Sequence, residues 1–333
     1  MLRPCQDRIA PHGKTLSQGL QVLNRMAAIS ARNASPSVPR RRGMSDRQIQ
    51  WLFIAPTLIL LVLMNIFPLF FSLYLSFTEY SVIKPNNPPV WVGLENFRHL
   101  LQDKQVWTYF ALTGRYVVLS VALQTLVGFG LAMLLREKFK GNGLITTLIL
   151  IPIMMSPVVI GLFWKLIFNP SYGIFNYLIG FTTPNAGPDW LAKPATALGA
   201  VIIVDVWMWS PFVMLLCLSG LKAIPDYLYE AASIDRASSW YQFWRITLPQ
   251  VAPLLLIAIL FRTIEAFKTF DLVMGLTGGG PGDATELAAV NLYRVAFTRF
   301  NTGESSALAY IMLVIVMAVS NLYVRSLNRV REG

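Results

Sequence analysis

The chain has 333 residues, of which 55% are hydrophobic and only 14% are charged, and its mean hydropathy is +0.52. Globular chains carry about 25% charged residues, so this composition excludes an ordinary water-soluble fold and is typical of a membrane protein. The formal net charge of +11 does not indicate a nucleic-acid partner, because the basic residues lie mainly in a terminal tail and in short segments between apolar runs.

The first 47 residues are rich in Arg, Ser and Pro and contain few large apolar side chains. Such a segment cannot bury enough surface to offset the entropy of ordering. Residues 1–47 are therefore predicted to form a disordered basic cytoplasmic tail. A cleaved signal peptide fits badly, because the basic region is long and the apolar run that follows it is of membrane-spanning length.

Six apolar runs follow, each long enough to cross about 30 Å of hydrocarbon as a helix of roughly 20 residues. They lack the alternation of an outer-membrane β-strand, and a helix satisfies its own backbone hydrogen bonds in lipid. Residues 48–333 are therefore predicted to be an all-α, polytopic membrane domain with six transmembrane helices. The six runs cover residues 51–78, 107–135, 144–168, 195–221, 251–276 and 305–324.

The distribution of basic residues indicates the orientation. Placing the N-terminus in the cytoplasm puts 18 Lys and Arg residues on that side and 6 on the other. Because cytoplasmic loops carry the excess of positive charge, both termini are predicted to be cytoplasmic.

The sequence offers no pattern for catalysis or for metal binding. Cys5 and Cys217 lie far apart, which excludes a disulfide framework or a CxxC metal site. A membrane-embedded protease or lipid-phosphate transferase would need a Ser/His or Asp pair or an acidic metal motif at membrane depth, and Asp205 and Asp271 lack such companions. Because no GxxxxGK[ST] loop occurs either, we expect no catalytic residue, no metal and no ATP bound to this chain.

The fifth apolar run carries four ionisable residues of alternating sign at a spacing of three, Arg262, Glu265, Lys268 and Asp271. An isolated charge at mid-bilayer costs roughly 2.5–3.5 kcal/mol, so these side chains must face protein or water. Residues three apart on a helix are neighbours, and each charge is expected to pair with the next. The ladder either lines the outer part of a hydrophilic pathway or is a self-neutralised structural contact with a neighbouring helix.

Asp205 is another charge at membrane depth, within the sequence IIVDVWMWSPF. A carboxylate beside aromatic faces suits a neutral sugar, since hydroxyls need acceptors and the apolar faces of the sugar ring stack on aromatics. The alternative is a tryptophan belt at the membrane interface. The predicted solute pathway comprises Asp205, Trp207, Trp209, Glu265, Lys268 and Asp271.

A polar block separates the fourth and fifth runs, and the charge distribution places it in the cytoplasm. Pro225 is suited to the start of a helix. Ser239-x-x-Gln242 is a capping-box pattern that would start a second helix, which Pro249 would end. Two short helices joined by a turn at residues 235–237 are predicted. Their apolar side has no obvious partner in the sequence, so it packs under the bundle or inserts into another protein.

The same block contains E-A-A-x-x-D-x-A followed by F-x-x-I-x-L-P. It resembles the EAA loop of the permease subunits of binding-protein-dependent ABC importers. The family pattern has glycine directly after the aspartate, where this chain has Arg236. A side chain with a Cβ costs about 1–2 kcal/mol in the left-handed conformation of a tight turn, so this turn is expected to be strained or differently shaped. The matching residues are Glu230, Ala231, Ala232, Asp235, Ala237, Phe243, Ile246, Leu248 and Pro249.

Three further segments, WVGLENFRHLL, VVIGLFW and LTGGGP, resemble the carbohydrate branch of these permeases, which includes maltose and glycerol-phosphate uptake systems. The resemblance implies an ABC type I importer transmembrane domain in the bacterial inner membrane that carries a sugar, polyol or glycerol-based solute. It also implies a coupling loop, residues 222–250. The residues implied to dock on a cytoplasmic ATPase are Glu230, Ala231, Ala232, Asp235, Arg236 and Ala237.

The partners implied by the resemblance are a second permease subunit in a heterodimer, two copies of an ATPase that binds ATP and Mg, and a periplasmic or extracellular solute-binding protein. The chain would then be a transport subunit rather than an enzyme. The alternative is an autonomous secondary transporter driven by an ion, with the charge ladder as its relay. A docking loop favours the subunit, because an autonomous carrier has no use for one.

Overall fold

The computed structural model describes residue 25 and residues 45–84, 88–137, 139–179 and 187–332. The chain divides into two units, Met1–Asn65 and Ile66–Gly333. Nearly all of the predicted tail, residues 1–47, lies outside the described residues. In the first unit, α2 (Asp46–Leu61) begins at a capping box in which Ser45 and Gln48 satisfy each other's backbone N–H groups, and it leads into the π-helical turn η1 (Val62–Ile66).

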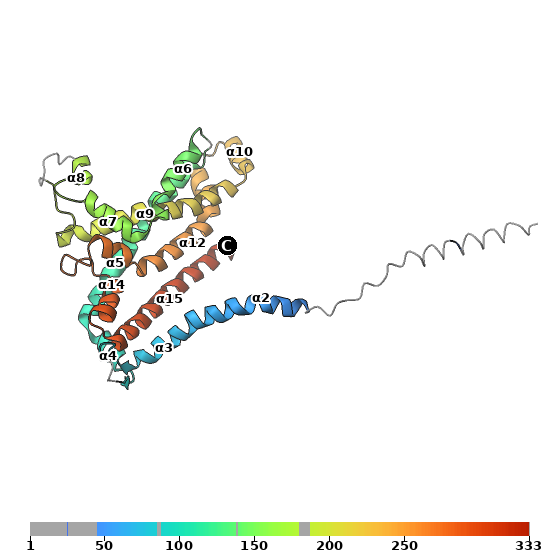
Figure 1. Cartoon of the computed structure of the whole chain (residues 1–333). Coiled ribbons are helices and arrows are strands. Elements are labelled where there is room, and N and C mark those ends of the chain that lie inside the picture. Colours follow the sequence, from blue (N-terminus) through green and yellow to red (C-terminus); the bar gives the residue numbers. More distant parts are fainter. Residues whose placement is uncertain (1–24, 26–44, 85–87, 138, 180–186, 333) are drawn as a thin grey trace, which may run out of the picture. The chain divides into compact units, whose positions relative to one another are not determined.

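The second unit is almost entirely helical (Figure 1). Its elements, in chain order, are α3 (Phe67–Ser76), β1 (Thr78–Glu79), β2 (Val90–Trp91), α4 (Glu95–Gln102), α5 (Lys104–Leu135), α6 (Asn142–Leu150), η2 (Pro152–Met154), α7 (Pro157–Ile167), α8 (Ile174–Leu178), α9 (Pro194–Ala223), α10 (Asp226–Ile234), α11 (Ser239–Gln242), η3 (Phe243–Thr247), α12 (Leu248–Phe267), α13 (Asp271–Leu276), α14 (Ala288–Tyr293), η4 (Arg294–Thr298) and α15 (Thr302–Glu332).

Five helices in the described part of the chain are long and apolar enough to cross a membrane, compared with the six that were predicted. They cover Arg47–Ser76, Lys104–Leu135, Pro194–Ala223, Ser239–Phe267 and Thr302–Ser326. The predicted third span is instead broken into α6, η2 and α7. Pro152 and Pro157 stand at the two breaks, and each removes a backbone donor that a continuous helix would need.

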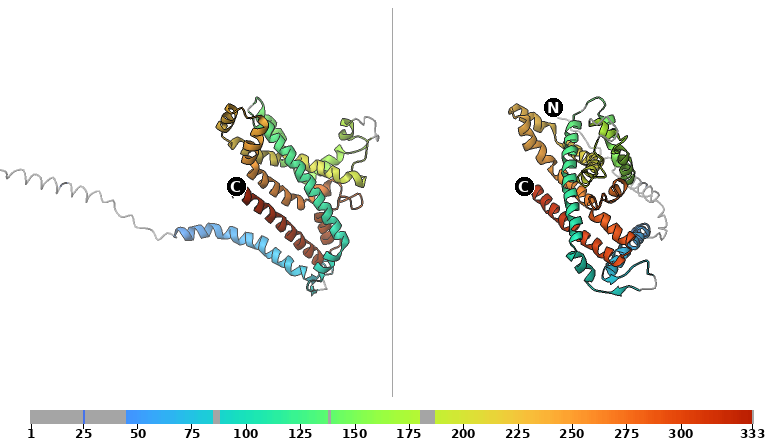
Figure 2. Two further views of the ribbon diagram at one scale, coloured as in Figure 1. Left: turned by 180° about the vertical axis from the view of Figure 1, so that it is seen from behind. Right: turned by 90° about the vertical axis from the view of Figure 1, so that its left-hand side faces the viewer.

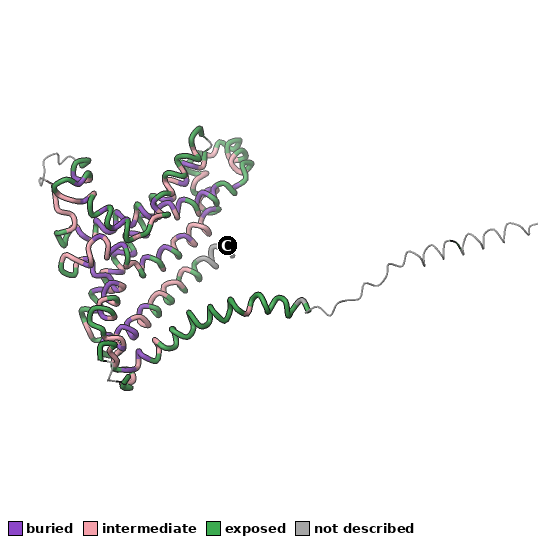
Figure 3. The backbone as a smooth tube through the Cα atoms, viewed as in Figure 1, coloured by how far each residue is buried: buried purple, intermediate pink, exposed green. Residues whose placement is uncertain are grey.

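α9 is the most deeply buried of these five helices. It packs along α5, and α12 contacts both of them, so that buried residues gather where these three helices meet (Figure 3). Gly128 of α5 permits the close approach to α9, because a Cβ there would lie 2.6 Å from the carbonyl oxygen of Ser210 and 2.7 Å from the Cβ of Val213.

The two ends of the second unit carry different elements (Figure 2). α6 and α10 lie together at one end, whereas α4 and the two short strands lie at the other. β1 and β2 pair antiparallel, with Thr78 opposite Trp91. The backbone N–H groups of Thr302 and Gly303 both donate to the carbonyl oxygen of Tyr80, so the loop after β1 is tied to the start of α15.

Candidate functional site

Three buried polar side chains from different helices meet inside the second unit. The Oδ2 of Asp205, on α9, accepts a 2.6 Å hydrogen bond from Nε2 of Gln124 on α5. The Oε1 of Gln124 accepts a 2.8 Å bond from Nε of Arg262 on α12, whose Nη2 lies 3.5 Å from Oδ1 of Asp205. All three side chains are buried, and a charge buried in this way is tolerable only when it is paired and hydrogen-bonded. The network therefore holds α5, α9 and α12 together.

Arg262 also packs against an aromatic ring. Its guanidinium carbon lies 4.2 Å from the ring centroid of Trp209, which is a cation–π contact. The two terminal nitrogens of Arg262 are buried without a hydrogen-bond acceptor in the described part of the chain. A guanidinium carries five N–H donors, so Arg262, which lines a neighbouring cavity, keeps some donors unbonded on nitrogens that are themselves buried.

The cavity has a volume of about 110 Å³ and combines charged, hydroxyl and aromatic side chains. Its lining brings together five of the six predicted pathway residues: Asp205, Trp209, Glu265, Lys268 and Asp271. Arg262, which was predicted as a member of the charge ladder, also lines this cavity. The remaining lining residues are Pro157, Thr269, Phe270 and Leu272.

The charges do not form the predicted ladder. α12 ends at Phe267 and α13 begins at Asp271, so the four residues do not share one helix. Lys268 donates a 2.8 Å hydrogen bond to Oε1 of Glu265, and both side chains are about half exposed. Arg262 pairs with Asp205 of α9 instead of with Glu265. The expectation that each charge pairs with the next is therefore met only by Glu265 and Lys268. Arg262 turns to Asp205 although it shares α12 with Glu265, and Asp271 lies beyond the end of that helix.

Trp207 is the predicted pathway residue that lies outside this cavity. It follows Asp205 by two positions, so its side chain leaves α9 on a different face. Its ring makes an edge contact with Trp164 of α7, at 5.5 Å between centroids, and it lines a separate, mainly apolar hollow beside α6.

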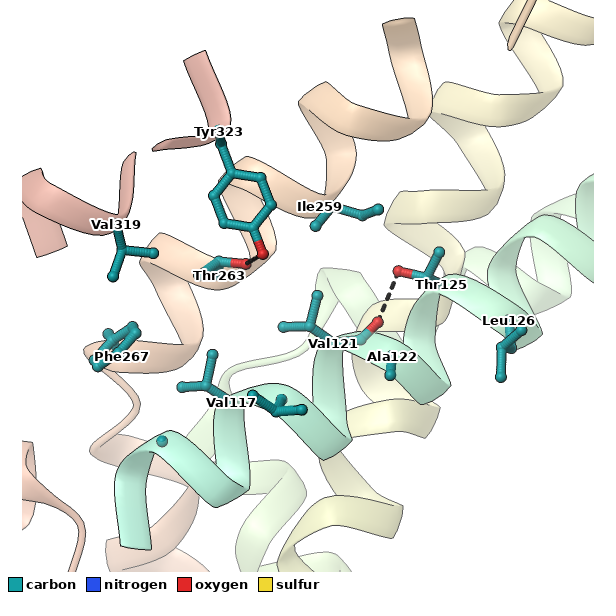
Figure 4. A pocket seen from close by; sticks show the side chains of 12 residues that line it. Val117, Val121, Ala122, Thr125, Leu126, Ile259, Thr263, Phe267, Val319 and Tyr323 are labelled. Atoms are coloured by element: carbon teal, nitrogen blue, oxygen red, sulfur yellow. Dashed lines mark hydrogen bonds between the residues drawn. The ribbon is translucent and has the colours of Figure 1, made fainter. Parts of the chain in front are cut away.

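A larger groove in the second unit is a poor site for a polar solute. It measures about 620 Å³ and lies between α5, α12 and α15 (Figure 4). Aliphatic and aromatic side chains make up most of its wall, and the hydroxyl of Thr263 already donates to Tyr323 over 3.4 Å. The chemistry of the lining therefore favours the smaller polar cavity as the candidate site.

The polar block between α9 and α12 forms the two helices that were predicted. α10 follows Pro225 and ends at Ile234, and the turn contains Arg236 with φ of +55°. This is the left-handed conformation in which glycine was expected. The backbone N–H of Arg236 donates to Ser233, and that of Ala237 donates to Ala232, which closes the turn.

The start and the end of the second helix differ from the prediction. Ser238, not Ser239, is the N-cap residue, and its Oγ accepts from the backbone N–H of Tyr241. Pro249 does not end the helix, because α11, η3 and α12 form one continuous helix, Ser239–Phe267. Pro249 lies inside this helix, directly after the π-helical stretch η3, and such a local π-helical adjustment re-satisfies the backbone groups that a proline frees.

The helix pair has one side packed on the bundle and one side exposed. The hydroxyls of Tyr229 and Thr247 lie 2.9 Å apart, and the guanidinium of Arg136 lies 4.2 Å from the ring centroid of Tyr229. The ring of Phe243 packs on Phe129 of α5. The expected coupling residues lie mainly on the open side: Glu230, Ala231, Asp235 and Arg236 are exposed, and Ala232 and Ala237 are partly buried.

Two polar features escaped the sequence reasoning. Gln124 sits alone in an apolar stretch of α5, and a long amide within a span is a signal that could have identified it. In the loop region around α14, Glu286 is buried and pairs with Arg294, which also donates a 2.8 Å bond to the carbonyl oxygen of Gly278. Nothing in the sequence indicated that Glu286 is buried, because a glutamate in a loop is usually exposed. No group of His, Cys, Asp and Glu suited to a metal occurs among the described residues.

The comparison with known protein families decides the identity. Residues 124–332 match the family described as binding-protein-dependent transport system inner membrane component. The chain belongs to this family of ABC importer permeases. The match includes Gln124, Asp205, Arg262 and the whole of the EAA block, so both candidate regions lie within the family's own domain.

Several named permeases are similar to this one over most of their length. It is 35% identical to the trehalose/maltose transport system permease protein MalF of Thermococcus litoralis, over 84% of this chain and 94% of the relative. It is 30% identical to the trehalose transport system permease protein SugA of Mycobacterium tuberculosis, over 92% and 98% of the two chains. It is 32% identical to the sulfoquinovosyl glycerol transport system permease protein SmoG of Agrobacterium fabrum, over 87% and 94%.

Solved structures share the fold of this permease. A chain of a bacterial ABC transporter involved in the import of the acidic polysaccharide alginate superposes with a TM-score of 0.72 at 21% identity, over 85% of this chain and 97% of that chain. The same transporter in complex with an alginate pentasaccharide-bound periplasmic protein gives a TM-score of 0.70. The chain therefore has the ABC type I permease fold and is a multi-pass membrane protein.

Proposed function

We propose that this permease forms part of the translocation pathway for a sugar, polyol or glycerol-based solute, and that the solute passes the cavity bounded by Asp205, Trp209 and Arg262. The observation that carries the proposal is the lining of this cavity, which sets the guanidinium of Arg262 and a carboxylate beside the indole of Trp209. Hydroxyl groups need both donors and acceptors, and the apolar face of a sugar ring stacks on an aromatic ring. The printed names of the relatives support a carbohydrate class.

Six membrane crossings follow if α6, η2 and α7 together serve as the third. These elements run from Asn142 to Ile167, long enough to reach across the hydrocarbon, and Pro-broken helices are tolerated where neighbouring protein or a polar cavity satisfies the backbone. An even number of crossings puts both termini on the same side as α10 and α11, and the excess of Lys and Arg assigns that side to the cytoplasm. We assign residues 48–333 to this domain in a bacterial inner membrane and residues 1–47 to a cytoplasmic tail.

Residues 222–250 act as the coupling loop in this proposal. The side chains assigned to the ATPase contact are Glu230, Ala231, Ala232, Asp235, Arg236 and Ala237. The open side of α10 supports this role, while Phe243 packs on Phe129 of α5 and Tyr229 lies under Arg136 at the end of the same helix, so that both fix the loop to α5. Closure of the ATPase would then shift a bistable bundle between inward and outward states. The chain is a transport subunit rather than an enzyme, and ATP and Mg belong to the ATPase.

The complete importer in this proposal contains a second permease subunit, two copies of the ATPase and a soluble binding protein. The binding protein is supported by the family description and by the solved complex of a structural neighbour. Reconstitution of all components in liposomes tests the assignment. Solutes are first screened by binding to the soluble protein, and their ATP-dependent uptake is then measured. Uptake without ATPase, driven by an ion gradient alone, would support the secondary-transporter alternative instead.

The coupling loop has its own test in the same system. Glu230→Lys, or deletion of Ala231 and Ala232, is expected to abolish solute-stimulated ATP hydrolysis while the bundle stays folded, because α10 has no fully buried residue, with Glu230 and Ala231 exposed and Ala232 partly buried. Far-UV circular dichroism and size-exclusion chromatography check the fold. Full coupled transport in these variants would contradict the role of the loop.

A further inference from the structure

The first two turns of the helix Ser239–Phe267 carry three large aromatic side chains that nothing covers in the described part of the chain. Trp240 is 70% exposed, Tyr241 55% and Trp244 49%. The rings of Trp240 and Trp244 touch edge to face at 5.6 Å between centroids, so they form one surface. The ring of Phe243 contacts both tryptophans on one side and Phe129 of α5 on another, so the two indoles rest on the bundle through Phe243 and keep their outer faces open.

The length of this helix places these residues beyond the hydrocarbon. It has 29 residues, which at a rise of ~1.5 Å per residue gives about 43 Å. The hydrocarbon core is only about 30 Å thick, and the whole bilayer with its headgroups measures about 40–45 Å. If α12 fills the core from Leu248 onward, the segment Ser239–Thr247 lies at headgroup depth. Trp and Tyr are enriched at that depth, since their rings combine an apolar body with a polar group.

Basic and acidic residues are unevenly divided between the segment Ser239–Thr247 and α10. Arg245 directly follows Trp244, is exposed, and makes no ion pair with any described residue. The segment Ser239–Thr247 contains no carboxylate, whereas Asp226 and Glu230 lie on α10. A basic residue beside exposed indoles is complementary to anionic phospholipid, which attracts Lys and Arg near the membrane surface.

We propose that the segment Ser239–Thr247 is a membrane-interface anchor, with Trp240, Tyr241 and Trp244 placed among the phospholipid headgroups and Arg245 contacting anionic lipid phosphate. α11 and η3 then fix the coupling loop to the bilayer surface, and α10 alone presents its face to the ATPase. Motion of α10 is transmitted into α12 around a point that the lipid holds. This anchor goes beyond the proposed function, because its partner is lipid.

Lipid contact is measured with bimane labels on single cysteines. Trp240→Cys, Tyr241→Cys and Trp244→Cys are made in a Cys5→Ser/Cys217→Ser background, assembled into the full importer and placed in nanodiscs. Ile234→Cys, on α10 and 81% exposed, is the matched control. Labels at the three aromatic positions are expected to be quenched by phospholipids brominated near the headgroup, and the label at 234 is not. Quenching by aqueous iodide alone at the aromatic positions would overturn the proposal.

The contribution of charge is tested in mixed bilayers of phosphatidylglycerol and phosphatidylcholine. With the label at 240, brominated phosphatidylglycerol is expected to quench about fivefold more effectively per molecule than brominated phosphatidylcholine. Arg245→Gln should remove most of this preference, while Arg136→Gln, whose side chain lies over Tyr229, should not. Loss of lipid quenching at 240 and 244 on ATPase binding would show that the aromatic face belongs to the ATPase and would also overturn the proposal.

Discussion

Arg262 of α12 donates a 2.8 Å hydrogen bond from Nε to Oε1 of Gln124 on α5. The amide nitrogen of Gln124 in turn donates a hydrogen bond to Asp205 of α9. One amide side chain thus bridges a buried cation and a buried anion that lie 3.5 Å apart at their nearest atoms. Because each helix contributes one member, the packing of these three helices and the polarity of the cavity depend on the same side chains.

Removal of the buried carboxylate is expected to destabilise the bundle. Asp205→Asn leaves Arg262 charged and without its partner, which costs about 3–5 kcal/mol of unfolding free energy. The double variant Asp205→Asn/Arg262→Met removes both charges and should recover most of the loss, since a buried ion pair is often replaceable by apolar side chains. SDS titration of the purified permease measures both values. A single variant as stable as the native chain would contradict the pairing.

The two neighbouring tryptophans of α9 are expected to behave differently. Trp209→Leu removes the ring beneath Arg262 and should lower the rate of solute uptake, whereas Trp207→Leu changes a side chain outside the cavity. Loss of the cation–π contact also costs about 1–2 kcal/mol. Uptake into liposomes at equal protein content compares the two. Equal loss of uptake in both variants would contradict the prediction that Trp209, and not Trp207, contributes to the solute pathway.

The crossing of α5 and α9 can be tested with two glycines on one helix. Gly128→Ala places a Cβ 2.6 Å from the carbonyl oxygen of Ser210 and should cost about 1–3 kcal/mol through overpacking. Gly130→Ala meets nothing within 4 Å and should stabilise the helix by up to about 1 kcal/mol. Thermal unfolding in detergent measures both changes. The interpretation fails if the two substitutions shift the midpoint in the same direction.

The turn in the coupling loop should become more rigid when its strained residue is replaced. Arg236→Gly relieves the cost of φ at +55°, about 1–2 kcal/mol, and part of that gain is offset by the entropy of glycine. Hydrogen exchange of the amide of Ala237, which donates to Ala232, is expected to slow several-fold. Ser233→Gly, one turn earlier in α10, serves as the control and should accelerate exchange. Faster exchange in Arg236→Gly would show that the arginine side chain stabilises the turn.

The EAA block shows what sequence pattern can predict. Pro225 and the turn at residues 235–237 depend on local backbone rules, and the structure agrees with both. The glycine of the family pattern implied a left-handed residue at 236, and of the two expectations for Arg236, strain or a different turn, the φ of +55° shows the strained one. The choice between Ser238 and Ser239 as the cap is a one-residue boundary, which pattern alone does not decide. Pro249 was misread because a proline that is accommodated inside a helix, here directly after a π-helical stretch, looks the same in sequence as one that ends a helix.

The charges at membrane depth show where pattern reasoning stops. Their placement against protein and water was predicted from the cost of charge in lipid, and the cavity brings five of the six pathway residues together. Their partners could not be predicted, because the end of α12 at Phe267 and the approach of Asp205 to Arg262 depend on tertiary packing. Pro152 and Pro157 are visible in the sequence of the third run, but whether a proline kinks a helix or breaks it into separate elements depends on the same packing.

The central claim is that solute passes the polar cavity, and the pair formed by Glu265 and Lys268 tests it most directly. Both side chains are about half exposed, so Glu265→Gln/Lys268→Met neutralises them without leaving a buried charge unpaired. The measurement is ATP-dependent solute uptake by the complete importer in liposomes at equal subunit content. We predict that uptake falls at least tenfold while basal ATP hydrolysis and complex assembly are retained. Unchanged uptake would contradict this claim and would mean that Glu265 and Lys268 have only a structural role.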